Sequence, residues 1–122
     1  MRLIIAALMA FHGIAHLAGF AGAWRLAPEG YPYRTTVLGG HVDLGDSGIR
    51  VVGVVWLALA IAFVTLSISA VGDAAWWPAT ALGVAAVSLL LSVMEFPEAR
   101  LGVLINIVLI AALAAGRWLG RI

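Results

Sequence analysis

The chain has 122 residues, of which 64% are hydrophobic and only 11% are charged. Because ordinary soluble domains carry about a quarter of charged residues, this composition excludes a soluble protein and indicates a membrane protein. The chain has no cysteine, which excludes disulfides, thiolate metal sites and CxxC redox chemistry. A net charge of +1 and the lack of a basic run exclude nucleic acid as a partner.

Four apolar stretches fill most of the sequence, at about residues 3–24, 49–71, 75–94 and 99–118. Each is close to the ~20 residues that a helix needs to cross ~30 Å of hydrocarbon. Backbone polar groups cannot remain unpaired in lipid, so we expect continuous helices. The sequence therefore predicts an all-α polytopic membrane protein with a single domain over 1–122, a four-transmembrane-helix bundle with one long polar loop between its first two helices.

Polar residues and prolines mark the expected helix ends. Asp46 and Ser47 are predicted to cap the second helix, and Pro78 is expected in the first turn of the third. Pro97 and Glu98 are predicted to open the fourth helix, where a missing N–H and a negative charge both suit a helix start.

The tryptophans at span ends are typical of an interfacial aromatic belt. These are Trp24, Trp76, Trp77 and Trp118.

The N-terminus also has features of a secretory signal peptide. Met1 and Arg2 precede an apolar core, and residues 21–23 form an A-x-A-like cleavage site. The apolar run is longer than the ~7–15 residues of a typical signal core. It also holds two histidines, so we favour an uncleaved first span.

The segment from 25 to 48 is expected to be an ordered loop, because it contains Pro28, Pro32 and the pair Gly39-Gly40. Threading four spans through a membrane puts nearly all acidic residues on the face of this loop. These are Glu29, Asp43, Asp46, Glu95 and Glu98, with Asp73 alone opposite.

The arginines divide four to three between the two faces, with the larger share on the loop face. This weak bias leaves the orientation open. All basic residues are arginine, and alanine, glycine and valine dominate, as in a GC-rich bacterial genome. We expect a bacterial inner-membrane protein with both termini in the cytoplasm.

His12 and His16 lie in the first span, four residues apart, and therefore face the same way on a helix. An ionisable residue inside a membrane is a functional-site hypothesis by default. His12 is expected near the midplane, and His16 nearer the loop face, which also holds Glu95 and Arg50. The pattern predicts a polar cup that narrows to the histidine pair.

The same residues have structural explanations. The histidines can donate single hydrogen bonds to neighbouring helices, with Asn106 and Ser88 as ready partners. Arg50 can pair with Asp46, four residues earlier on the same helix. Glu95 can be an ordinary charge at a helix end. The sequence alone leaves both interpretations open.

A metal site is the weaker chemical possibility. Met9, His12 and His16 form a stripe whose thioether and imidazoles suit copper, or zinc without the thioether. Methionine in such a helix is normally apolar filling, however. Haem is less expected still, since the only other histidine, His41, lies in the loop. Proton handling is the broader possibility.

The run from Phe11 to Phe20 resembles the HG-x-x-K-L-x-G signature of DoxX-like proteins, which are small four-helix bacterial membrane proteins. His12-Gly13, Leu17 and Gly19 match this signature, and His16 stands where the family has lysine. A neutral imidazole can be buried in a membrane more readily than the charged ammonium group of lysine, so this replacement changes the chemistry of the position. The resemblance covers about ten residues. It implies an accessory subunit of a quinone-linked redox complex.

Three functions follow. The leading one is an accessory subunit or partner of a membrane redox system, with quinone as the possible cofactor and His12, His16 and Asn106 as its candidate contacts. The second is an intramembrane enzyme or carrier for a small lipophilic molecule, using His16, Glu95 and Arg50. The third is a structural assembly subunit. The expected partners are the bilayer and either a larger membrane complex or a second copy of the chain.

Overall fold

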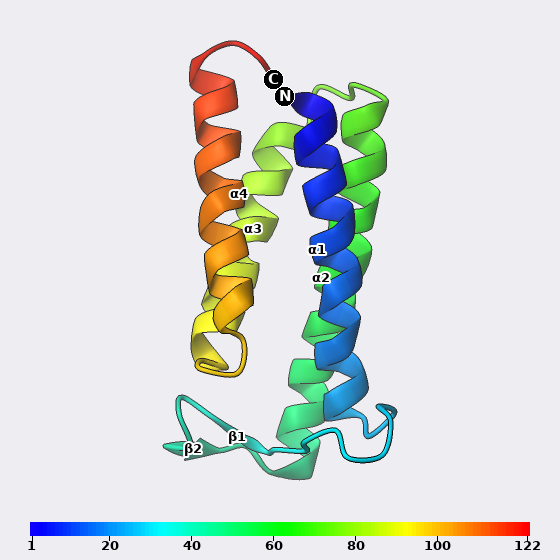
Figure 1. Cartoon of the computed structure of the whole chain (residues 1–122), viewed down its shortest axis with the longest axis vertical. Helices are drawn as coiled ribbons and strands as arrows, with labels where there is room; N and C mark the ends of the chain where they lie inside the picture. Colours follow the sequence, from blue (N-terminus) through cyan, green and yellow to red (C-terminus); the bar gives the residue numbers. More distant parts are fainter.

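The structure is a computed structural model that describes residues 1–122, and its regular elements are four helices and one short hairpin. Its elements are α1 (Arg2–Ala23), β1 (Thr36–Val37), β2 (Val42–Asp43), α2 (Gly45–Val71), α3 (Trp77–Met94) and α4 (Arg100–Trp118). All four helices are long and apolar enough to cross a membrane, which confirms the predicted four-helix, multi-pass architecture. Both termini lie at one end, and the long loop with its hairpin lies at the other (Figure 1).

The second helix begins earlier than predicted. It starts at Gly45, so Asp46 and Ser47 lie inside its first turn, and no side chain caps it. The Asp43 carboxylate instead accepts a hydrogen bond from the Gly45 N–H at 2.9 Å. Gly45 has a φ of +67°, which glycine adopts without strain. The predicted caps, Asp46 and Ser47, are therefore wrong, because the helix already begins at Gly45 and Asp43 accepts from its first N–H.

Pro78 lies in the first turn of α3 as predicted, but Pro97 and Glu98 precede the fourth helix, which starts at Arg100. The Ala99 N–H bonds to the Glu95 carbonyl at 3.0 Å, and the Arg100 N–H to the Pro97 carbonyl at 3.1 Å. These bonds form a compact turn between α3 and α4. The two residues thus shape the connection rather than the helix.

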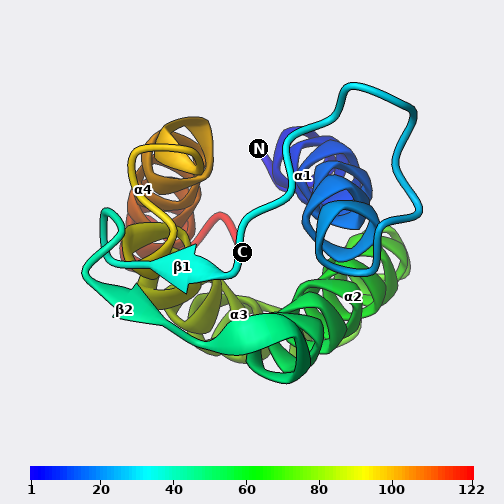
Figure 2. The ribbon, with the colours of Figure 1, turned by 90° about the horizontal axis from the view of Figure 1, so that it is seen from below.

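The helices form an arc in the order α1, α2, α3, α4, as the view from the loop end shows (Figure 2). The packing between α1 and α2 is the most extensive, and α1 and α4, at the two ends of the arc, contact each other far less. Close approach of α1 to α2 depends on Gly13, where a Cβ would lie 2.8 Å from the Phe63 Cβ. The Ser67 hydroxyl also donates to the Ala6 carbonyl at 2.7 Å.

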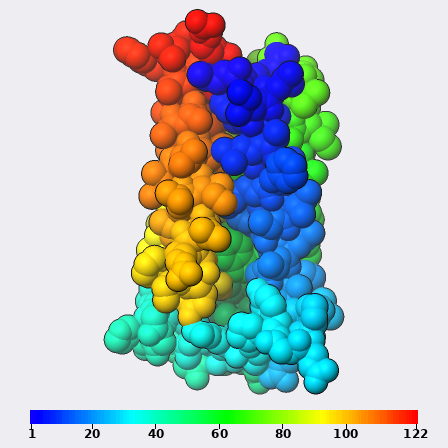
Figure 3. Space-filling model, in the orientation of Figure 1, coloured from blue at the N-terminus to red at the C-terminus, as the bar shows by residue number.

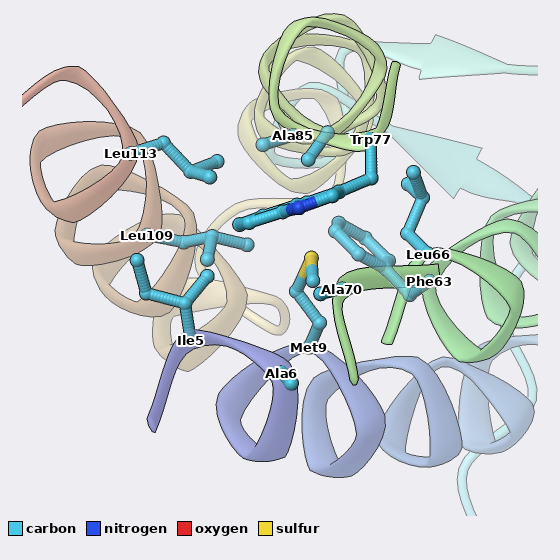
Figure 4. Close-up of a cluster of buried hydrophobic side chains, with 11 residues drawn as sticks. Ile5, Ala6, Met9, Phe63, Leu66, Ala70, Trp77, Ala85, Leu109 and Leu113 are labelled. Atoms are coloured by element: carbon cyan, nitrogen blue, oxygen red, sulfur yellow. The ribbon is translucent and has the colours of Figure 1, made fainter. Parts of the chain in front are cut away.

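An apolar cluster closes the half of the bundle nearer the termini (Figure 4). Met9 of α1, Phe63 of α2, Trp77 of α3 and Leu109 of α4 meet there, and each is at most 1% exposed. Trp77 therefore belongs to the core and not to the predicted aromatic belt. Its position in the first turn of α3 turns its ring inward between the other helices. The other three tryptophans of the predicted belt, Trp24, Trp76 and Trp118, are exposed.

A second apolar cluster lies at the loop end and fixes the hairpin to the bundle. Val37 of β1 packs with Ile49 and Trp56 of α2 and with Leu91 of α3. The Leu38 N–H donates to the carbonyl of Met94 at 2.7 Å, which ties the hairpin to the end of α3. Side chains of the long loop thus complete this second core.

Candidate functional site

The two histidines lie side by side on the buried face of α1. His12 is 3% exposed and His16 4% exposed, and their ring centroids are 4.3 Å apart. His12 Nε2 lies 3.1 Å from Asn106 Oδ1 of α4, and His16 Nε2 lies 2.8 Å from Ser88 Oγ of α3. The structure thus brings each histidine onto one of the two partners that the sequence offered.

Asn106 connects these contacts into one network. Its Nδ2 donates to Ser88 Oγ at 2.9 Å and to the Gly102 carbonyl at 2.9 Å, within α4. Because Asn106 Oδ1 can only accept, His12 carries its proton on Nε2 in this arrangement. The Ser88 hydroxyl is then free to donate to His16 Nε2. A hydrogen-bonded layer therefore joins α1, α3 and α4 between the two apolar clusters.

One polar atom of the layer has no partner. His12 Nδ1 is buried and accepts no hydrogen bond. No group of three or more His, Cys, Asp or Glu residues is placed to hold a metal ion. Met9, the proposed third member of a metal stripe, packs in the apolar cluster. His41 lies exposed in the hairpin turn, away from the pair.

Aromatic rings of α2 enclose the pair. Phe63 packs edge-on against both histidines, with centroids 5.1 Å from His12 and 5.4 Å from His16. Trp56 packs edge-on against His16 at 4.8 Å. The Trp56 ring fits only because α1 has Gly19 beside it, where a Cβ would lie 2.7 Å from ring atoms. Its buried indole Nε1 lies toward the Glu95 carboxyl but makes no hydrogen bond of normal geometry.

A cavity of about 420 Å³ lies at the loop end, where α1 and α4 diverge. Small residues of α1, among them Ala18 and Gly19, form one wall. The hairpin, the residues around Tyr31 and the connection Met94–Glu98 form the others. Figure 3 shows this region as a recess between α1 and the lower part of α4. The cavity therefore opens near the expected membrane–water interface.

Glu95 is the half-buried acid of this cavity. Burial raises the pKa of its carboxyl, the Trp56 indole N–H acts in the opposite direction, and the nearby Glu98 raises it further. Glu98 itself is paired with Arg34 of the loop. No cation lies within ion-pair distance of Glu95. The site thus holds one unpaired carboxyl in partly apolar surroundings.

Arg50 does not join this site. It is exposed, its guanidinium lies 5.5 Å from the Trp24 ring, and it does not line the cavity. The predicted pair between Arg50 and Asp46 is also wrong. Asp46 instead accepts hydrogen bonds from Arg25, at 3.3 Å, and from the Tyr33 hydroxyl. Both groups belong to the loop between α1 and β1.

The predicted polar cup is therefore only partly assembled. Trp56 neighbours both Glu95 and His16, whereas Arg50 and Asp43 of the hairpin are exposed. Sequence reasoning missed Trp56 and Arg34. Trp56 had a signal, because it is the one tryptophan in the middle of a predicted span. Arg34 had none, since its place depends on the path of the loop.

No family model, curated protein or solved structure matches this chain. The site must therefore be interpreted from its own geometry.

Proposed function

We propose that this protein binds or carries a small lipophilic molecule with a polar head, held in the cavity at the loop end. The observation that carries the proposal is the single unpaired carboxyl of Glu95 in a cavity between diverging membrane helices. Ligand sites are typically concave and mostly apolar, with few polar groups that fix orientation. A volume of about 420 Å³ lies within the range of such sites.

The walls suit an amphipathic ligand. Trp56 and Tyr31 pack over Gly19 and Gly22, so the part of the α1 wall left open is the small side chain of Ala18. A flat or extended apolar group can lie against α1 there. The polar groups are confined to the connection between α3 and α4 and to the loop. A ligand would therefore place its head at Glu95 and its apolar part along α1, toward the lipid.

Native purification with mass spectrometry of bound small molecules tests this proposal. We expect a copurifying lipophilic molecule with the wild-type protein. Ala18→Phe should remove it, because the ring occupies the cavity. Ala15→Phe is the matched control, since Ala15 is an exposed residue of α1 outside the cavity lining. Retention of the same molecule by Ala18→Phe would contradict the proposal.

A second candidate is a partner of a bacterial inner-membrane redox system, with quinone as its ligand. It is supported by the DoxX-like run on α1 and by the network of His12, His16, Ser88 and Asn106 in the bundle centre. His12→Ala and His16→Ala should then impair a redox phenotype in a deletion strain while the proteins still fold. Full complementation by both variants would leave the network a structural role in assembly.

A further inference from the structure

We infer that the molecule held in this cavity carries a protonated amine on an apolar chain, and that its ammonium group pairs with the Glu95 carboxylate. This inference rests on the proposed binding function and names the chemical class of its ligand. It excludes anionic heads, and it distinguishes Glu95 from every other acid of the chain.

Charge pairing around the cavity leaves one position for a cation. Glu98 is neutralised by Arg34, and Asp46 by Arg25. At the opposite end of the bundle, Asp73 pairs with Arg2 at 2.5 Å. Asp43 and Glu29 are exposed and solvated. Glu95 is the only acid that is both half-buried and without a cation.

A buried carboxylate without a partner is costly, and an incoming cation offsets that cost. Tyr31 and Phe96 line the same cavity and offer aromatic faces, which attract ammonium groups. An anionic head would meet two carboxyl groups, and the one arginine nearby is already engaged by Glu98. The electrostatics and the walls therefore favour the same ligand class.

The charge balance of Glu95 depends on groups from three of the segments around it. The connection after α3 supplies Glu98, the loop supplies Arg34 and Tyr31, and α2 supplies the Trp56 N–H. The α1 wall has no titratable side chain among its lining residues. When the ammonium binds a protonated Glu95, the carboxyl proton is released to water and an ion pair forms. Binding should therefore strengthen as pH rises and Glu95 ionises.

The probe is octylammonium, with octanol as the neutral control of equal chain length. The full chain in mild detergent is labelled with ¹³C at the glutamate carboxyl carbon. There are only three glutamates, so single substitutions assign all resonances. We expect octylammonium, and not octanol, to move the Glu95 titration to lower pH. Repeating the titration in phosphatidylglycerol nanodiscs with and without phosphatidylethanolamine distinguishes a free amine from a lipid headgroup as the source.

Three variants separate the inference from the binding proposal. Glu95→Gln should weaken octylammonium binding by about tenfold or more, which corresponds to about 1.4 kcal/mol. Glu29→Gln, an exposed loop control, should bind as wild type. Ala18→Phe should abolish binding of any ligand. If Glu95→Gln binds octylammonium normally while Ala18→Phe does not, the cavity stands and the amine inference fails. If Ala18→Phe also binds normally, the cavity proposal fails as well.

Discussion

Asn106 is the residue on which three helices converge. Its side chain accepts from His12 and donates to Ser88, so it connects α4 to both α1 and α3. Hydrogen bonds between helices in membranes are individually weak, at about 0.6 kcal/mol on average. A buried polar group left without its partner costs more, about 1–3 kcal/mol. Asn106 therefore matters chiefly because its loss leaves other polar groups unpaired.

Asn106→Leu should lower the free energy of unfolding by about 1–3 kcal/mol, because His12 and Ser88 lose a shared partner. Unfolding in mixed detergent micelles, followed by circular dichroism, measures this. Ser69→Ala is the matched control, since its hydroxyl bonds only to the Thr65 carbonyl of its own helix. That variant should stay within about 0.5 kcal/mol of wild type. Equal stability of Asn106→Leu and wild type would show that the layer contributes nothing.

Glu95 and Asp43 should affect stability with opposite pH dependence. Burial first raises the pKa of Glu95 above its ordinary value of 4.5, so the folded state binds this proton more tightly than the unfolded state. Its favourable contribution is present below pH 4.5 and is lost as pH rises through the folded pKa. The Gly45 N–H and the Thr35 hydroxyl lower the pKa of Asp43, so its contribution is lost as pH falls.

Unfolding measured between pH 3 and 8 tests this difference. Glu95→Gln should remove a loss of stability on going from acid to neutral pH, and Asp43→Asn should remove a loss on going from neutral to acid. The two variants act as controls for each other, since both replace a carboxyl by an amide. The same change in pH dependence for both would contradict the assigned environments.

At the scale of elements, the apolar runs predicted the four helices well, but they did not predict the side-chain contacts at the helix ends. Continuous hydrophobicity and the pairing of backbone groups are local properties, so four spans and a shared face for His12 and His16 followed from spacing alone. Side chains at the helix ends depend on distant segments. Asp46 is engaged by Arg25 and Tyr33 of the loop instead of by Arg50.

The cavity could not be predicted for the same reason. Its walls come from α1, the hairpin and the α3–α4 connection, which are far apart in sequence. No periodic pattern records that Glu95 and α1 line one cavity, or that Trp56 neighbours both Glu95 and His16. The candidate residues were visible in the sequence, but the way they combine depends on tertiary packing.

The close packing of α1 against α2 at Gly19 predicts how a larger residue at this position changes stability. Gly19→Ala should lower the free energy of unfolding by about 1–3 kcal/mol through overpacking, because its Cβ would lie 2.7 Å from the Trp56 ring, which is only 5% exposed. Gly83→Ala is the matched control, since a Cβ there meets nothing within 4 Å. It should be neutral or stabilising by up to about 1 kcal/mol. Detergent unfolding of both variants provides the measurement, and equal effects would contradict the close approach.

Over the whole molecule, the two ends of the bundle are built differently. At the end with the termini, all four helices contribute to one apolar cluster, and α1 and α4 meet through Ile5 and Leu109. At the loop end, α1 and α4 diverge, and Val37 of the hairpin joins a second apolar cluster with residues of α1, α2 and α3. The hydrogen-bonded layer separates the closed half from the half that holds the cavity. This asymmetry places the cavity that holds Glu95 at the loop end.

The final prediction concerns topology and the retention of α1. Because the chain has no cysteine, single cysteines at Glu29, Ala75 and Arg121 report accessibility without background. The fold requires the first to label from one face and the other two from the opposite face. If both termini are cytoplasmic, an impermeant maleimide applied to intact cells reaches only the cysteine at position 29; the reverse pattern would invert the orientation but keep the fold.

Intact-mass measurement of the same variants tests whether α1 is cleaved. Ile5, Ala6 and Met9 belong to the closed apolar cluster, and both buried histidines also come from α1. A mature protein that begins at Trp24 would lose its most extensive helix pairing, one wall of the cavity and half of the hydrogen-bonded layer. We therefore expect residues 1–23 to remain in the membrane protein, and a mass corresponding to their removal would overturn both the fold and the proposed site.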